Sequence, residues 1–159
     1  MLLQRISLSN FLSYRGVPNA SGKTIPIDID FYDSSLWLIY GPNGTGKSSI
    51  FDAITFALFK KHRGAESANH AFSYLISDGA DQANIDLELA LNNRRYLVQR
   101  QIKRAKKSAK VWGIVREWTG KDWKAVPNTE DNVEKWVRVN IRMTYETFVS
   151  AVLLRQGEE

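Results

Sequence analysis

The stretch Gly41-Pro42-Asn43-Gly44-Thr45-Gly46-Lys47-Ser48 decides how the rest of this sequence is interpreted. It matches the phosphate-binding loop pattern G-x-x-x-x-G-K-[ST] at every fixed position. Residues 36–40, directly before it, form a short, continuous apolar run that predicts a buried central strand. Residues 48–59, directly after it, carry isoleucine or leucine at four-residue spacing, which predicts a helix with a broad apolar face. Strand, glycine-rich loop and helix in this order predict a P-loop NTPase of the α/β class.

The residue types in the loop suit a bound nucleotide. Its glycines lack a Cβ, so the backbone can turn tightly and approach an anion closely. The loop N–H groups and the helix N-terminus would then face the phosphates with partial positive charge. Lys47 is expected to reach the β- and γ-phosphates, and the Ser48 hydroxyl is expected to ligate Mg²⁺. The backbone contacts are expected from Gly44, Thr45 and Gly46.

Composition bounds the class of protein. The chain has 159 residues, of which 43% are hydrophobic and 25% charged, as expected for one globular domain spanning residues 1–159. It contains no cysteine, which excludes disulfides and cysteine–zinc sites. No secretory leader and no apolar run of membrane-spanning length is present. These features predict a cytoplasmic protein without a membrane partner.

Alternating apolar residues predict further strands on both sides of the loop. The expected strands are 2–11, 25–31 (an edge strand, because of Pro26), 85–91, 95–103, 111–118 and 123–126. The last four form an antiparallel β-meander, with Asn92-Asn93 as a tight turn. A helix capped by Asn128 or Thr129, a short helix from Thr144 and a final strand over 151–154 are expected next.

The aromatic and histidine residues predict no separate site. The five tryptophans, at 37, 112, 118, 123 and 136, are expected to fill the core. His62 and His70 have neither metal-ligand spacing nor a catalytic partner, and we expect both at the surface.

Positive charge is concentrated in one part of the chain. The net charge is +5, but residues 94–110 hold eight Lys and Arg residues and no acid. Such a stripe predicts a sequence-independent contact with DNA phosphates, although a solvated hairpin is the simpler alternative. The residues of this basic stripe are Arg94, Arg95, Arg100, Lys103, Arg104, Lys106, Lys107 and Lys110.

A catalytic carboxylate is missing from the expected place. P-loop ATPases carry one at the end of an apolar strand, where it acts on Mg²⁺ and on the attacking water. No apolar run after the loop ends in such an acid, and Asp86 and Glu88 alternate with leucines instead. The sequence therefore predicts a nucleotide-binding half without its catalytic half.

Three segments together carry a family resemblance: Asn10-Phe11-Leu12-Ser13-Tyr14-Arg15-Gly16, the loop with the following Ser49 and Phe51-Asp52-Ala53-Ile54, and Leu154-Arg155-Gln156-Gly157-Glu158. With them the whole chain resembles the N-terminal lobe of SMC-like ABC ATPases, and most of all the SbcC type, the ATPase of a double-strand-break repair nuclease complex. The resemblance implies ATP and Mg²⁺ as ligands. It implies that Gln156 contacts Mg²⁺ and acts with Lys47 in hydrolysis, that Asn43 approaches the γ-phosphate, and that Ser49 reaches the α-phosphate.

The sequence departs from this family at one position. Leu12 stands where archaeal members often place a nucleotide-contacting arginine, and Arg15 from the same turn is the candidate substitute. Ile76 and Asp78 fall where the family lines the adenine.

The resemblance also implies partners. These are the protein's own C-terminal ATPase lobe beyond a coiled coil that begins after this sequence, a second ATPase subunit that ATP clamps to the first, a nuclease subunit of the SbcD type, and double-stranded DNA of the nucleoid.

Two other P-loop functions stay open on the sequence alone. A stand-alone nucleoside or nucleotide kinase would need an arginine-rich lid and an acceptor-site carboxylate, and we find neither. An ABC transporter ATPase would need a membrane partner. Activity that depends on an added C-terminal lobe would favour the repair ATPase, whereas phosphate transfer to a nucleoside by the chain alone would favour the kinase.

Overall fold

The computed structural model describes residues 1–32, 34, 36–62, 72–106 and 109–152. Its main element is a six-stranded antiparallel sheet in the order β4-β1-β5-β6-β7-β8. The bounds of these strands are β1 Leu2–Ser9, β4 Ile27–Asp30, β5 Gln82–Leu91, β6 Arg94–Arg104, β7 Ala109–Trp118 and β8 Trp123–Ala125. A separate small hairpin pairs β2 Val17–Pro18 with β3 Thr24–Ile25. The helices are α1 Lys47–Phe59, a 3₁₀ turn at Phe72–Leu75, α2 Val133–Asn140 and α3 Tyr145–Val152.

The sheet confirms the predicted meander. Strands β5 to β8 follow one another in sequence and in space, each antiparallel to the last. Asn92 and Asn93 make the β5–β6 turn with φ angles of 51° and 60°, the positive values that a two-residue hairpin turn requires. Strand β4 lies at the edge, and Pro26, which has no N–H to donate, directly precedes it.

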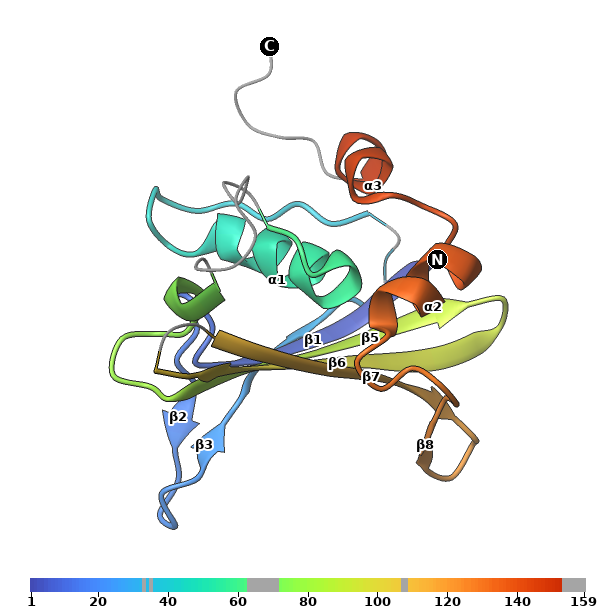
Figure 1. Ribbon diagram of the computed structural model, residues 1–159. Coiled ribbons are helices and arrows are strands. Elements are labelled where there is room, and N and C mark those ends of the chain that lie inside the picture. The colour runs from blue at the N-terminus through green and yellow to red at the C-terminus, as the bar shows by residue number, and fades with distance from the viewer. Residues whose placement is uncertain (33, 35, 63–71, 107–108, 153–159) are drawn as a thin grey trace.

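One face of the sheet carries the core. The helices lie on this face (Figure 1), and α1 contacts β5, β6, α2 and α3. Ile85, Leu87 and Val98 project from the strands and are fully buried, as are Phe56 and Leu58 of α1. The broad apolar face predicted for α1 is confirmed, because its side chains pack against both the sheet and the smaller helices.

The opposite face of the sheet is polar, and three tryptophans expected in the core belong to it. Trp118 and Trp123 pack against each other with ring centroids 5.2 Å apart, and the Arg95 guanidinium lies 5.6 and 5.7 Å from their ring centres. Trp112 lines a hollow on this face. Among the described tryptophans only Trp136 belongs to the core cluster, where it packs on a tyrosine of β6.

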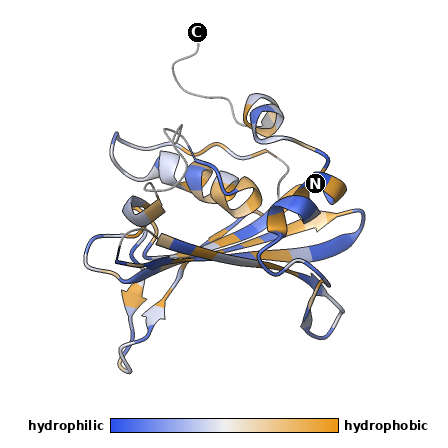
Figure 2. Cartoon of the chain, in the orientation of Figure 1, coloured by the Kyte–Doolittle hydropathy of each residue, from blue (hydrophilic) through white to orange (hydrophobic). Residues whose placement is uncertain are grey.

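The predicted strand over residues 36–40 is wrong. The segment is coil, with Leu36, Leu38 and Tyr40 exposed by 85%, 84% and 86%, and Trp37 by 48%. A strand needs a neighbour for its backbone groups, and the strip has none among the described residues, where β4 is an edge strand beside β1. In Figure 1 this coil runs above α1 while the sheet lies below, and Figure 2 shows its hydrophobic colouring. We call residues 36–40 the apolar strip.

Three smaller expectations also need correction. His62 is buried with 4% exposure, because its ring packs against Phe72 and hydrogen-bonds the Tyr74 hydroxyl. Neither Asn128 nor Thr129 caps helix α2, whose N-cap is Asn132. The Thr129 hydroxyl accepts a hydrogen bond from the Val115 N–H and donates one to the Val126 carbonyl. Residues 151–152 belong to helix α3, so no strand forms there. His70 and residues 153–154 lie outside the described residues.

Candidate phosphate-binding site

Helix α1 begins directly at the end of the glycine-rich loop. Its N-cap is Gly46 with φ +87°, no side chain caps it, and its first turn holds no acid. The first N–H groups of a helix have no partner within the helix, and they carry the positive end of its dipole. This N-terminus therefore presents uncapped donors at the position where the sequence places the phosphates.

The loop is folded around the lysine that the motif predicts. The Lys47 ammonium donates hydrogen bonds to the carbonyl oxygens of Gly41 (2.7 Å) and Pro42 (2.6 Å). The Thr45 hydroxyl donates to the same Pro42 carbonyl at 2.9 Å. The Lys47 ammonium is therefore bonded to the backbone of the same loop that the motif assigns to the phosphates.

A turn from the beginning of the chain supports the loop. The Tyr14 hydroxyl donates to the Gly46 carbonyl at 3.3 Å, and burial raises the pKa of Tyr14, so this group stays protonated at neutral pH. A Cβ placed on Gly46 would lie 2.5 Å from the Ser13 hydroxyl oxygen. Glycine is therefore favoured at position 46 for two reasons, its positive φ and the close approach of the Ser13 side chain. The loop motif alone did not indicate these two neighbours, although both stand in the family-like segment near the N-terminus.

The same turn is joined to the segment after the 3₁₀ element. The Leu12 N–H donates to the Leu75 carbonyl, and the Ser77 N–H donates to the Asn10 carbonyl, each at 2.8 Å. The Ser77 hydroxyl adds a bond of 2.6 Å to the Leu12 carbonyl. The fold thus links the turn that carries Arg15, the segment that carries Ile76 and Asp78, and the end of the loop.

The predicted nucleotide contacts differ in how accessible they are. The side chains of Arg15 and Asp78 are exposed, whereas Ile76 is 2% exposed, so only its backbone is open to a ligand. In the loop, Asn43, Gly44, Thr45 and Ser48 are exposed, and Gly46, Lys47 and Ser49 are half-buried. Gln156 lies outside the described residues.

The two acids named in the sequence lie on the polar face of the sheet. Glu88 is 3% exposed and pairs with Arg5 and with Arg95, and it also accepts a bond of 2.9 Å from Tyr32. Asp86 accepts from Gln99, and burial raises the pKa of its carboxyl group. Both acids belong to β5, whose opposite face packs on α1, so neither is placed for the missing catalytic role. Among the described residues no cluster of His, Asp and Glu side chains could hold a metal ion.

The basic stripe is divided by the fold. Arg100 must be removed from the DNA-contacting set, because it is 3% exposed and donates to the Ala57 carbonyl and to Glu134, each at 3.0 Å. Burial lowers the pKa of this guanidinium, although Glu134 opposes that effect. Its neighbour across the sheet is Gly113, where a Cβ would lie 2.7 Å from an Arg100 nitrogen.

The other members of the stripe lie nearer the surface. Arg94 pairs with Glu117 at 3.2 Å, Arg95 is held by Glu88 and two tryptophans, and Arg104 donates to the Ala80 carbonyl at 2.9 Å. Lys103, Lys106 and Lys110 are exposed, and Lys107 lies outside the described residues.

Comparison with known proteins agrees with this architecture. A sequence family described as AAA domain matches residues 5–159. The chain belongs to this family. It is similar to the probable DNA double-strand break repair Rad50 ATPase of Aquifex aeolicus, with 34% identity over 84% of the chain and 13% of the relative. It is also similar to the SbcC component of the nuclease SbcCD of Deinococcus radiodurans, with 30% identity over 82% of the chain and 14% of the relative.

A solved structure shares the fold of this AAA domain. The SMC head domain from Thermotoga maritima aligns with a TM-score of 0.52 and 21% identity, covering 91% of the chain and 43% of the head domain. The SMC-like fold and the SbcC-type resemblance expected from the sequence are thus confirmed. The chain spans only 13% and 14% of the length of the Aquifex aeolicus and Deinococcus radiodurans relatives. Among the described residues no helix is long and apolar enough to cross a membrane.

Proposed function

We propose that this chain is the ATP-binding N-terminal lobe of a DNA-repair ATPase of the Rad50 and SbcC kind. The observation that carries the proposal is the uncapped N-terminus of α1, which meets the lysine-bearing loop through a left-handed glycine. Donor groups and a cation converge there and suit a triphosphate. The names of the relatives, which are repair ATPases, support ATP hydrolysis as the activity of the whole protein.

The residues of the site fit ATP with Mg²⁺ in the following way. The backbone of Gly44, Thr45 and Gly46 would hold the phosphates, and Lys47 would leave the loop carbonyls to meet them. Ser48, which is exposed at the first turn of α1, would hold Mg²⁺ together with Gln156. When bound, ATP supplies the phosphoryl group that is transferred to water. Asn43, Ser49, Arg15 and the backbone at 76–78 would complete the nucleotide contacts.

We further propose that a C-terminal ATPase lobe covers the apolar strip. Four large side chains of the strip are exposed, next to the loop that they precede in sequence. Strands from another lobe would supply the backbone partners that β4 does not. In that arrangement the C-terminal lobe would also bring the missing carboxylate, and ATP would clamp two such ATPase subunits together.

Double-stranded DNA and a nuclease subunit of the SbcD type are the remaining proposed partners. Lys103, Lys106 and Lys110 are exposed near the β6–β7 turn and suit phosphate contacts. The name of the SbcCD relative, which describes part of a nuclease, supports the nuclease partner. In the cell such a complex would associate with the nucleoid.

Nucleotide binding is the first test. Binding of a fluorescent ATP analogue with Mg²⁺ should be measurable for the native chain and lost in Lys47→Ala, because the cation facing the phosphates is removed. Lys23→Ala, which changes an exposed lysine in the β2–β3 loop, should bind as the native chain does. Equal binding by native protein and Lys47→Ala would overturn the proposed site.

Turnover separates the two lobes. We expect negligible hydrolysis by the chain alone and ATP-dependent pairing and turnover after addition of the C-terminal lobe. In that mixture Gln156→Ala should keep most ATP binding and lose most hydrolysis. Robust turnover by the pure chain, or normal turnover by the Gln156 variant, would contradict these assignments.

DNA contact is tested through its salt dependence. Changing Lys103, Arg104, Lys106 and Lys107 to Glu should lower duplex affinity and flatten the slope of log affinity against log salt, with ATP binding intact. The matched control is Arg100→Met, which removes a buried cation and should leave the slope unchanged. An unchanged slope in the fourfold variant would leave the stripe as solvated surface.

A further inference from the structure

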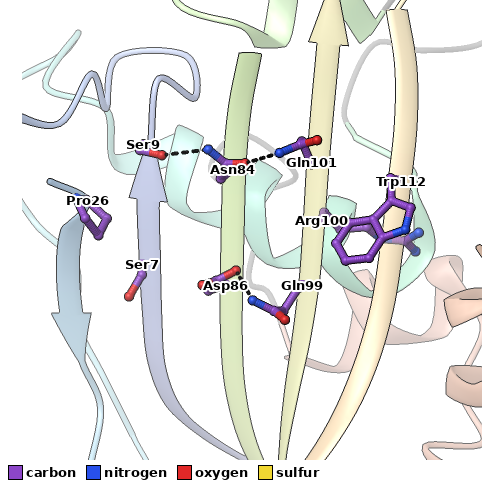
Figure 3. Close-up of a pocket in the computed structure, with 9 residues that line it drawn as sticks. All are labelled: Ser7, Ser9, Pro26, Asn84, Asp86, Gln99, Arg100, Gln101 and Trp112. Carbon is purple, nitrogen blue, oxygen red and sulfur yellow. Dashed lines mark hydrogen bonds between the residues drawn. The ribbon is translucent and has the colours of Figure 1, made fainter. Parts of the chain in front are cut away.

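The polar face of the sheet has a hollow that the nucleotide site does not use. Its volume is about 310 Å³, which falls in the range of roughly 300–1,000 Å³ typical of small-molecule sites. It lies over β1, β5, β6 and β7, on the face opposite α1 (Figure 3). Figure 3 shows hydroxyl, amide and carboxyl side chains around it, with one indole ring, the ring of Pro26 and Arg100, whose guanidinium is bonded on the covered face of the sheet. The hollow therefore has room for one planar polar group.

Hydrogen bonds hold the amides of the hollow in fixed orientations. The Asn84 amide donates to the Ser9 hydroxyl at 3.2 Å, and the Gln101 amide donates to the Asn84 carbonyl at 3.1 Å. In the described part of the chain the side-chain amide oxygen of Gln101 accepts no side-chain hydrogen bond. A preoriented acceptor thus faces the hollow, with its direction set by the row of side chains behind it.

Asp86 provides a second acceptor, two residues along β5 from Asn84 on the same face of the sheet. Asp86 accepts a bond of 3.1 Å from the Gln99 amide, whose carbonyl in turn accepts from Arg116 at 2.7 Å. The second Asp86 carboxyl oxygen accepts no side-chain or backbone hydrogen bond from the described residues. Two acceptors that lack donors are complementary to a ligand that brings N–H groups of its own.

An aromatic ring stands beside these acceptors. Trp112 lies directly opposite Gln101 in the β6–β7 register and is half-buried. Its indole N–H donates to Glu130 at 3.2 Å, which fixes the ring in place. Figure 3 shows the ring standing over β6 and β7 at the edge of the hollow. A fixed ring next to fixed acceptors offers stacking and hydrogen bonding to one planar ligand.

Two cations flank the hollow at the next position of the same face. Lys103 and Lys110 are paired in register, two residues along from Gln101 and Trp112, and both are exposed. Because strands rise about 3.3 Å per residue and alternate faces, the lysines stand about 7 Å from the amide–indole pair. Aromatic stacking, amide contacts and adjacent cations are the combination by which sheets bind single-stranded nucleic acid.

We propose that this hollow binds one unpaired, amino-bearing nucleobase of single-stranded DNA. The base stacks on Trp112 and donates its exocyclic amino group to the acceptors on Gln101 and Asp86. The flanking phosphates lie on Lys103 and Lys110. Cytosine, which carries an amino group, fits these acceptors, whereas thymine presents a carbonyl oxygen at the same place. The proposal rests on the proposed DNA function, and it adds that the bound DNA is single-stranded and that cytosine is preferred over thymine.

Anisotropy titrations with labelled oligo-dC, oligo-dT and duplex DNA test the proposal. Native protein should bind oligo-dC severalfold more tightly than oligo-dT. Trp112→Ala should lower oligo-dC affinity about tenfold or more at unchanged salt slope, since it removes stacking and no charge. Trp123→Ala is the matched control, because it removes a tryptophan from the same sheet face outside the hollow. Thermal unfolding of both variants excludes loss of fold as the cause.

A substitution of the acceptor gives an independent readout. Asp86→Asn keeps an acceptor for Gln99 but turns the second oxygen into an amide donor, so the preference for oligo-dC over oligo-dT should disappear or reverse. Oligo-dC should also quench tryptophan fluorescence in native protein and not in Trp112→Phe if that residue is the stacking ring.

The outcomes separate this proposal from the DNA function on which it rests. Salt-dependent duplex binding, combined with equal affinity for both oligonucleotides and a neutral Trp112→Ala, would overturn the base site and leave the phosphate contact standing. Absence of binding to every DNA would overturn both. Capture of an oligosaccharide or a peptide in the hollow without any effect of Trp112→Ala on oligo-dC would also overturn the base site.

Discussion

Strand β5 and the apolar strip are both rich in leucine, and their surroundings are opposite. Leu87 and Leu89 of β5 are fully buried, with paired strands at both edges and α1 above. Leu36 and Leu38 are 85% and 84% exposed in a coil. The contrast shows that an apolar run becomes a strand only where neighbours take its backbone groups and cover its side chains. In the described structure β5 has both kinds of neighbour, whereas the strip has neither a paired strand nor cover for its leucines.

The largest expected effect on stability comes from truncating one leucine in each of the two regions. Leu87→Ala should lower the free energy of unfolding by about 2–5 kcal/mol, because it leaves a cavity under α1. Leu38→Ala should change it by no more than about 0.5 kcal/mol, because that side chain is already in water. Urea unfolding followed by circular dichroism measures both. Similar losses in the two variants would mean that the strip is packed in solution.

A smaller effect sharpens the comparison between the two faces of the sheet. Arg100→Met removes the bonds to Glu134 and to the Ala57 carbonyl on the covered face, with an expected loss of about 1.5–3 kcal/mol. Arg94→Met removes an exposed pair with Glu117 and should lose no more than about 1 kcal/mol. Chemical unfolding of both variants measures the two losses. Equal losses would contradict a stabilising role for the buried Arg100 bonds to Ala57 and Glu134.

The loop that follows the strip gives a third, smaller contrast. Gly44 and Gly46 have φ angles of +83° and +87°, so alanine is strained at both positions. Only at Gly46 would the new Cβ meet a neighbour, the Ser13 hydroxyl. Gly46→Ala should therefore lower the free energy of unfolding more than Gly44→Ala does. The difference should lie at the lower end of about 1–3 kcal/mol, because the Ser13 hydroxyl can rotate away from the new methyl group. Equal midpoints would show that the N-terminal turn does not hold the loop in solution.

The smallest effect concerns the polar face and depends on pH. Burial raises the pKa of the Asp86 carboxyl in the folded state. Ionising this group therefore lowers the free energy of unfolding as the pH rises from the ordinary pKa of an aspartate through the raised pKa of the folded state. Asp86→Asn cannot ionise and keeps an acceptor for Gln99. The variant should melt higher than native protein near neutral pH, and the gain should vanish at about pH 3, where the native carboxyl is protonated. A gain that is constant with pH would contradict the burial of this charge.

The parts of the fold that sequence could predict are those decided locally. Strands β5 to β8 follow from alternation, and the Asn92-Asn93 turn follows from residues that tolerate positive φ. The strand prediction for the strip was wrong because a short apolar run indicates burial but does not say what covers the side chains, and in the described structure Leu36, Leu38 and Tyr40 are exposed. A count of consecutive apolar residues contains no information about which neighbour would pair with the backbone.

The candidate site was predictable in its loop and less so in its surroundings. Lys47 and the glycines are marked by fixed spacing, whereas the support from Ser13 and Tyr14 depends on a contact over more than thirty positions, as the Tyr14–Gly46 bond shows. Arg100 looked like any other member of the basic stripe. Its difference comes from alternation within β6, which places it on the covered face with Val98 and Ile102, beneath α1 and opposite Gly113. That signal was available in the sequence, whereas the register that sets Gly113 opposite it was not.

The position of the Lys47 ammonium has a consequence for any affinity measured at this loop. The ammonium has three N–H donors, and its bonds to the carbonyls of Gly41 and Pro42 use two of them, which leaves one for a phosphate. A second phosphate contact requires one carbonyl to be released, so the measured dissociation constant for that contact is the intrinsic one divided by the fraction of molecules already released. A partner that draws the two carbonyls away would tighten nucleotide binding without touching the nucleotide, because these carbonyl oxygens compete with the phosphate oxygens for the same ammonium.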